Sequence, residues 1–185
     1  MSKLEIVEKI KQLYGETFLH QSALRLRNGA KRIDGLIGNR RYSTIVEIGT
    51  FNGVTSAFLS QYCDALVTID INESQVETRR QLWENLGINN ITPYTIRNDE
   101  EKKDILKKYD YDFVFIDGGH SYDEVKFDYE LTCKCGRVLF HDYGHIAKEG
   151  AIRLNNPVKK FIDTLPQDEI KADDIFALWV KNGSR

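Results

Sequence analysis

Short apolar runs alternate with longer segments of helical periodicity along most of the chain. Runs rich in β-branched and aromatic residues predict strands at 44–49 (TIVEIG), 65–70 (ALVTID), 112–117 (DFVFID) and 137–142 (RVLFHD). A further run, 91–96 (ITPYTI), contains Pro93, which predicts an edge strand or an irregular start. The end of the chain, IFALWVKN, also alternates as strands do. Together these runs predict a sheet of about seven strands.

The segments between these runs have the apolar spacing of helices. The spacing predicts helices over 54–63, 73–87, 99–109, 121–134 and 156–165, and two more within 3–39, the second from about 23 to 37. Strands that alternate with helices predict an α/β, Rossmann-like, doubly wound sheet, mostly parallel and covered on both faces. The last two strands are separated by few residues, so one of them should be antiparallel. We expect a single domain over 1–185, with 1–40 as a helical cap.

Composition and charge narrow the function. The chain has 185 residues, 41% hydrophobic and 29% charged, and a net charge of −2, so nothing favours nucleic acid or an anionic membrane as partner. No apolar stretch approaches the roughly 18 residues that span a bilayer. The three cysteines are an odd number, and Cys133 and Cys135 are too close to pair easily. We therefore expect a reducing, cytoplasmic location.

A glycine loop follows the first predicted strand. It reads VEIGTFNGVTS (46–56), with Glu47, Gly49 and Gly53, and lacks the G-x-G-x-x-G pattern of dinucleotide sites. Glu47 would repel a phosphate and suits a ligand with a positive centre and an amino group. Asp70 closes the second strand, where a carboxylate can accept both hydroxyls of a ribose. The pattern predicts a ligand that has a ribose but no pyrophosphate.

These segments resemble class I S-adenosylmethionine-dependent methyltransferases. The resemblance rests on VEIGTFNGVTS, VTIDIN, IRNDE, FVFIDGGHSYDEV and VLFHDYGH. FIDGGHSY followed by FHDY is similar to a subgroup of metal-dependent O-methyltransferases that act on sugars and catechol-like phenols. The resemblance implies S-adenosylmethionine as cofactor, a small-molecule hydroxyl as acceptor, and cofactor contacts from Glu47, Gly49, Thr50, Gly53, Asp70, Asn98, Asp99 and Asp117.

The resemblance also implies a metal site and a base. Asp117 and Asp142 close the fourth and fifth strands, where two carboxylates suit Mg²⁺. The usual third ligand is an acid or amide, but His141 stands here, which suits Mn²⁺, Fe²⁺ or Zn²⁺ better. Asp117 is also expected to be catalytic. His120 lies where relatives carry a lysine base, and the same role is expected of it, with a structural role or a metal ligand as the alternatives.

Three other functions remain open at this stage. The first is a nicotinamide-dependent oxidoreductase, which would need the first glycine of the G-x-G-x-x-G pattern that this chain lacks. A metal-dependent hydrolase could use Asp117, His120, His141, Asp142 and His145, but it gives no role to the glycine loop. A non-enzymatic cofactor-binding domain of a larger assembly is the third, and a second copy in a homodimer could complete the cap.

Two further expectations concern the edges of the site. Tyr122 and Tyr143 flank the rim and could stack on a sugar or an aromatic ring. The charged segment 99–108 indicates a solvated helix face, except for Asp99 at its start.

Overall fold

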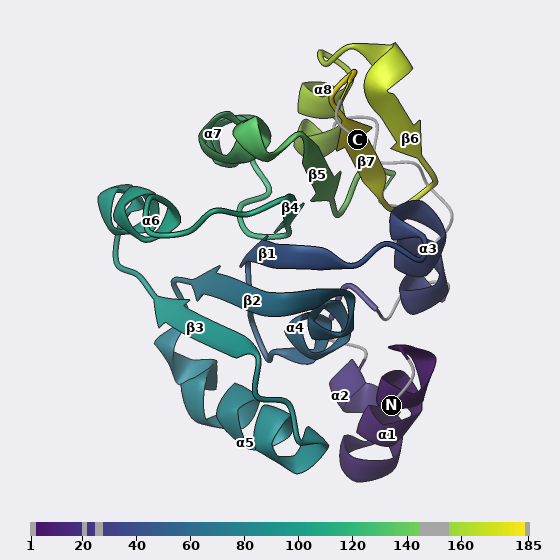
Figure 1. The fold of residues 1–185 in the computed structure, drawn as a ribbon, viewed down its shortest axis with the longest axis vertical. Coiled ribbons are helices and arrows are strands. Elements are labelled where there is room, and N and C mark those ends of the chain that lie inside the picture. The colour runs from purple at the N-terminus through teal and green to yellow at the C-terminus, as the bar shows by residue number, and fades with distance from the viewer. Residues whose placement is uncertain (1–2, 20–21, 25–27, 145–155, 184–185) are drawn as a thin grey trace.

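A seven-stranded sheet forms the centre of the molecule (Figure 1). The computed structural model describes residues 3–19, 22–24, 28–144 and 156–183. The strand order is β3-β2-β1-β4-β5-β7-β6, and the pairings from β3 to β5 are parallel. The strands are β1 (Tyr42–Ile48), β2 (Cys63–Asp70), β3 (Ile91–Thr95), β4 (Phe113–Ile116), β5 (Arg137–Phe140), β6 (Ile170–Ala172) and β7 (Ala177–Val180). The predicted Rossmann-like fold class is confirmed.

The two ends of the sheet also agree with the sequence. β3, which carries Pro93, is an edge strand and pairs only with β2. An edge position leaves one side of the strand unpaired, so the missing N–H of proline costs little there. β7 lies antiparallel to both β5 and β6, as the short connection between the last two strands predicted.

Helices cover both faces of the sheet, and on each face an apolar cluster lies between the helices and the strands. One cluster lies under α1 (Lys3–Tyr14), α2 (Glu16–Leu19), α3 (Gly29–Ile37), α4 (Val54–Leu59) and α5 (Val76–Leu86). The other lies under α6 (Asp99–Leu106), α7 (Tyr122–Thr132) and α8 (Pro157–Ile162). Strand residues alternate between the clusters: Phe113 and Phe115 join the first, and Val114 and Ile116 the second. No helix in these described ranges is long and apolar enough to cross a bilayer.

The observed helices are shorter than the predicted ones, and two of the differences have a clear local cause. The second N-terminal helix begins at Gly29 rather than near residue 23, because Asn28 has a left-handed backbone with φ 66°. A Cβ on Gly29 would overlap the backbone of Ala23 and Leu24, so the preceding turn requires this glycine. The helix predicted over 54–63 ends at Leu59, followed by a 3-10 turn, and β2 begins at Cys63. Apolar periodicity did not distinguish this turn from helix.

The order of the strands fixes where the site lies. β1 pairs with β2 on one side and β4 on the other. Strands up to β3 are therefore added on one side of β1, and the strands from β4 onward on its other side. Ile48, Ile69 and Ile116 lie in register at this point. The residues that follow these strands therefore meet at one edge, where ligands bind in open α/β sheets.

Candidate active site

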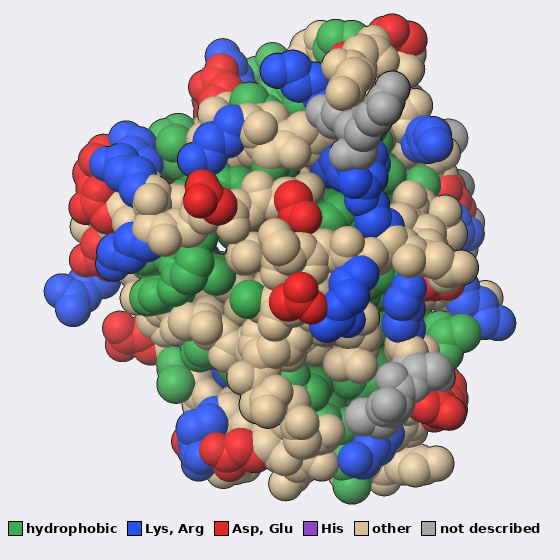
Figure 2. Space-filling view, in the orientation of Figure 1, with side chains coloured by type: hydrophobic (Ala, Val, Ile, Leu, Met, Phe, Trp, Pro, Cys, Tyr) green, Lys and Arg blue, Asp and Glu red, His purple; other side chains and the backbone are tan. Residues whose placement is uncertain are grey.

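A large open cavity of about 1780 Å³ lies along the carboxyl ends of the parallel strands. Its wall contains most of the side chains and glycines that the sequence singled out: Gly49, Thr50, Asp70, Asn98, Asp99, Asp117, His120, His141 and Asp142. The face of the molecule in Figure 2 carries Lys, Arg, Asp and Glu side chains intermixed, without a field of one sign that would suit a polyanion.

Asp70 organises the glycine loop. One carboxylate oxygen accepts the N–H groups of Thr50 at 2.8 Å and Phe51 at 2.5 Å, and the other accepts the N–H of Asn72 at 2.7 Å. Phe51 has a φ of 45°, so these hydrogen bonds hold the loop in a turn that non-glycine residues rarely adopt. Asp70 is therefore held in place at the wall of the cavity, and the oxygen that accepts only the N–H of Asn72 keeps a lone pair for a ligand.

Gly49 lies where β1 and β4 end side by side. Its φ is 99°, and a Cβ there would overlap the carbonyl oxygen of Asp117. Only glycine lets the two strand ends approach so closely. Gly49 itself therefore contributes only backbone to the cavity wall.

Glu47 is not among the residues that line the cavity, and the cofactor contact expected of it stays a prediction. Its side chain is fully buried on the α4 and α5 side of β1, where it accepts hydrogen bonds from Ser56 and, at 2.6 Å, from Thr68. Burial raises the pKa of Glu47 to about 8, because desolvation of the carboxylate outweighs the lowering by the hydrogen bonds from Ser56 and Thr68, and the nearby Asp117 and Asp70 add smaller contributions that raise it. The carboxyl is largely neutral at pH 7.

Glu47 is nevertheless connected to the cavity wall. The hydroxyl of Thr68, which donates to Glu47, lies 2.6 Å from the hydroxyl of Thr50. Thr50 lines the cavity, and its backbone N–H holds Asp70. The carboxyl thus supports the glycine loop from beneath.

Gly53 is the second residue that the structure places behind the wall rather than in it. A Cβ on Gly53 would lie 2.7 Å from Cβ of Arg79 and 2.9 Å from the ring of Trp83. The indole N–H of Trp83 donates to the Gly53 carbonyl at 2.9 Å. This glycine allows α4 and α5 to pack closely, so its predicted contact with a cofactor is not direct.

Three potential metal ligands gather on the other side of Gly49. Asp117, His141 and Asp142 each offer one ligand atom, and these atoms lie within 4.8 Å of one another. Nδ1 of His141 lies 2.8 Å from Asp117 and 3.4 Å from Asp142. Burial alone would lower the pKa of His141, but the two carboxylates outweigh it and raise the pKa to about 9. Two carboxylates and an imidazole are a donor set that fits a divalent cation.

His120 lies at the open side of the same group. Its Nδ1 is 3.1 Å from Asp142, and the ring is 64% exposed toward the cavity. The hydrogen bond with Asp142 raises the pKa of His120 more than burial lowers it. If Nδ1 carries the proton that is shared with Asp142, Nε2 is left free to accept one.

The side of the cavity near Asn98 and Asp99 contains a buried ion pair that sequence reasoning missed. Lys102 is mostly buried rather than solvated, and its ammonium lies 2.6 Å from Asp128 and 3.3 Å from Asp99. Asp128 is 2% exposed, and both Lys102 and Asp128 line the cavity. The signal was an acid within the apolar stripe of α7, where Val125 and Thr132 are its buried neighbours.

Asn98 has a local structural role at this side. Its side-chain oxygen accepts the N–H of Glu101 at 3.0 Å and so caps α6. Its place in the cavity wall agrees with the prediction, and the cap fixes the start of α6 and therefore the position of Asp99.

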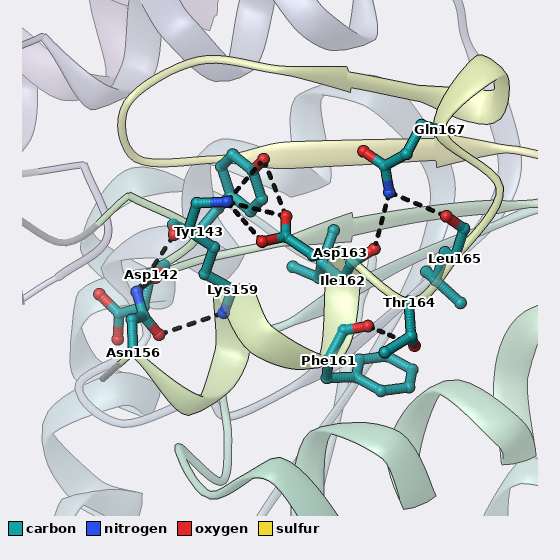
Figure 3. A network of polar contacts seen from close by, with 10 residues as sticks. All are labelled: Asp142, Tyr143, Asn156, Lys159, Phe161, Ile162, Asp163, Thr164, Leu165 and Gln167. Atoms are coloured by element: carbon teal, nitrogen blue, oxygen red, sulfur yellow. Dashed lines mark hydrogen bonds and ion pairs between the residues drawn. The ribbon is translucent and has the colours of Figure 1, made fainter. Parts of the chain in front are cut away.

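The two tyrosines expected at the rim face α8 instead. Tyr122 packs edge-on against Phe161, with ring centres 5.7 Å apart. Tyr143 lies against Lys159 and Asp163 (Figure 3). Neither lines the cavity, so the expectation that they stack on an acceptor is wrong for this structure. His145 lies outside the described residues.

Several solved structures share this fold across nearly the whole chain. A protein from Staphylococcus aureus assigned as a caffeoyl-CoA O-methyltransferase has a TM-score of 0.67 at 20% identity, covering 97% of this chain and 99% of that one. The O-methyltransferase TomG from Streptomyces achromogenes, in complex with S-adenosylmethionine, has a TM-score of 0.64 at 19% identity and covers 96% of both chains. An O-methyltransferase from Bacillus cereus, in complex with S-adenosylhomocysteine, has a TM-score of 0.65 at 15% identity, covering 96% and 91%.

The sequence itself identifies the family. No curated protein matches it significantly. A family model described as a methyltransferase domain matches residues 46–143, more than half of the chain. The match begins in β1 and ends just after β5, so it contains the glycine loop, Asp70 and the group around Asp117. It favours a methyltransferase over the oxidoreductase and hydrolase alternatives, and the chain belongs to the methyltransferase domain family.

Proposed function

We propose that this protein transfers a methyl group from S-adenosylmethionine to a hydroxyl of a small molecule. The observation that carries the proposal is that one cavity joins Gly49, Asp70 and Asp99 on one side to Asp117, His120 and Asp142 on the other. A methyl donor and an acceptor hydroxyl can therefore meet above the point where β1 and β4 diverge. The O-methyltransferases of the same fold support this assignment.

The cofactor would occupy the side of the cavity formed by β1, β2 and β3. Asp70 would accept the ribose hydroxyls, Gly49 and Thr50 would border the methionine part, and Asn98 and Asp99 would border the adenine. Glu47 and Gly53 act indirectly, through the loop they support. S-Adenosylmethionine supplies the methyl group, and this chain supplies the orientation that shortens its path to the acceptor.

The acceptor hydroxyl must lose a proton as it attacks. His120 is the group for this step, because it is exposed to the cavity and Asp142 orients its ring through Nδ1. Asp117, His141 and Asp142 would hold a divalent cation, and their mixed donor set favours Mn²⁺ over Mg²⁺. Such an ion lowers the pKa of a bound hydroxyl and so makes it easier for His120 to deprotonate.

The N-terminal helical segment completes the site on its outer side. Ser22 and Ala23, which precede α3, belong to the cavity wall. This contact supports the expectation that residues 1–40 act as a cap within the single domain. The cap contributes to selecting the acceptor, and pairing of two copies as a homodimer would enclose it further.

The first test measures the cofactor directly. Calorimetry with S-adenosylhomocysteine should give a dissociation constant in the micromolar range for the wild type and at least a tenfold weaker one for Asp70→Ala. A transfer assay with radiolabelled S-adenosylmethionine against sugars and catechols should then label one class. Absence of binding to the wild type at millimolar cofactor would contradict the proposal.

A further inference from the structure

The backbone at Asp142 is held in an unfavourable conformation. Its φ is 60°, in the left-handed region, although the residue is not glycine. A non-glycine residue there costs on the order of 1 kcal/mol or more and persists only where its surroundings require it. This conformation directs the Asp142 carboxylate to within 3.1 Å of His120 and 3.4 Å of His141.

Asn156 supplies the contacts that hold this backbone. Its side-chain amide donates to the carbonyl oxygen of Asp142 at 2.5 Å and to that of Tyr143 at 3.1 Å (Figure 3). Its side-chain oxygen accepts the N–H of Lys159 at 3.1 Å and so caps α8. One side chain therefore ties the end of β5 to the start of α8.

The neighbouring contacts make this connection rigid. The ammonium of Lys159 lies 2.6 Å from Asp163 and 4.7 Å from the centre of the Tyr143 ring. The Tyr143 hydroxyl donates to Asp163 at 3.3 Å, and its backbone N–H donates to Ile175 at 2.9 Å. Tyr143 is thus fixed both to α8 and to the turn before β7, which leaves the Asp142 backbone little freedom.

We propose that Asn156 is a positioning residue, which acts through the backbone of Asp142 to set its carboxylate toward His120 and His141. The inference rests on the proposed function for the role of Asp142 in holding a cation and orienting the base. Asn156 is not among the residues that line the cavity. Its helix-capping role and its positioning role use different atoms, so they can be separated.

The substitution Asn156→Asp separates the helix-capping role of Asn156 from its positioning role. Aspartate keeps an oxygen that can cap α8, but it cannot donate to the two carbonyls and would repel them. Asn156→Ser is a second variant that keeps the cap and is too short to reach both carbonyls. Asn90→Asp is a matched control, because Asn90 also donates to two carbonyls, those of Ser60 and Cys63 at 3.0 and 3.2 Å, but neither of these residues lines the cavity, whereas Asp142 does.

The readouts are Mn²⁺ affinity by electron paramagnetic resonance, S-adenosylhomocysteine affinity by calorimetry, and crystal structures of the variants. In Asn156→Asp and Asn156→Ser we expect Mn²⁺ affinity to fall roughly 10–100-fold, as outer contacts of metal ligands typically cause. We expect cofactor affinity to stay within about twofold, as the cofactor side is not connected to Asn156. Asn90→Asp should change neither affinity.

The structures decide the inference independently of the metal. Asp142 should leave the left-handed region in Asn156→Asp and move its carboxylate away from His120. If Asp142 keeps its φ and its distance to His120 in that variant, the inference is overturned whatever the Mn²⁺ affinity does. If the wild type binds no Mn²⁺, the cation in the proposed function fails, and the Asp142 geometry alone decides the role of Asn156.

Discussion

At the scale of single residues, the buried carboxyl of Glu47 makes stability depend on pH. Its pKa in the folded protein is about 8, well above its ordinary value of 4.5. A raised pKa means that folding favours the neutral form. Its contribution to stability is therefore fully present below about pH 4.5 and is lost as pH rises through about 8, which amounts to roughly 5 kcal/mol at most for a shift of this size.

Glu47→Gln removes this dependence while keeping the shape of the side chain. We expect the variant to be more stable than the wild type above pH 8 and to show a flatter profile between pH 5 and 9. Urea denaturation at several pH values measures both. Glu84→Gln, which alters an exposed carboxyl paired with Arg80, should parallel the wild type. A wild-type profile that also stays flat would show that Glu47 ionises normally.

His120 is the residue on which turnover should depend most directly. Glutamine keeps a group that can donate to Asp142 but cannot accept a proton. We expect His120→Gln to lower kcat by about 10²–10⁴, the usual contribution of a general base, with little change in cofactor affinity. The measurement is single-turnover methyl transfer to the acceptor identified in the assay with sugars and catechols. A variant that retains most of the wild-type kcat would assign His120 a structural role.

At the scale of elements, two glycines should respond in opposite directions to the same substitution. Gly49 joins β1 to the loop at a φ of 99° with no room for a Cβ, whereas Gly35 lies within α3 with nothing within 4 Å of the added atom. We expect Gly49→Ala to destabilise the fold by several kcal/mol and Gly35→Ala to stabilise it by about 1 kcal/mol. Urea denaturation compares the two. Equal effects would mean that the strand ends do not approach as described.

The elements and much of the site follow from the sequence because their signals are local. The runs TIVEI and FVFI are short, apolar and β-branched or aromatic, and acids at the ends of parallel strands must share one edge. Asp70, Asp117 and Asp142 do lie on one edge, in the wall of the same cavity. The alternation within β1 also carried a signal that was not used: Glu47 shares the face of Ile45, which points toward α4 and not toward the edge.

What the sequence did not predict depends on packing between distant segments. Lys102 is drawn inward by Asp128, which lies on another helix, and nothing in the charged segment around it distinguishes it from solvated lysines. Tyr143 turns toward α8 because Lys159 and Asp163 lie there. The double role of Asn156 is likewise invisible in the sequence, where an Asn-Pro pair indicates only a helix start.

At the scale of the whole molecule, the point between β1 and β4 divides the cavity into two halves. The half built on β1, β2 and β3 carries Asp70, and the half built on β4 and β5 carries Asp117. Gly49 lies between them, and no hydrogen bond among the described residues joins Asp70 directly to the group around Asp117. Substitutions in the two halves should therefore have nearly independent effects on binding.

Asp70→Asn and Asp117→Asn test this division, since each removes one charge and keeps the side-chain volume. Asp70→Asn should weaken S-adenosylhomocysteine binding at least tenfold and leave Mn²⁺ affinity within about twofold, because its lost hydrogen bonds belong to the glycine loop. Asp117→Asn should weaken Mn²⁺ binding at least tenfold and leave S-adenosylhomocysteine affinity within about twofold. In the wild type, a chelator should lower turnover and Mn²⁺ should restore it. If each variant weakens binding of both S-adenosylhomocysteine and Mn²⁺, the two halves form one coupled site, and the junction at Gly49 does not keep their binding energies independent.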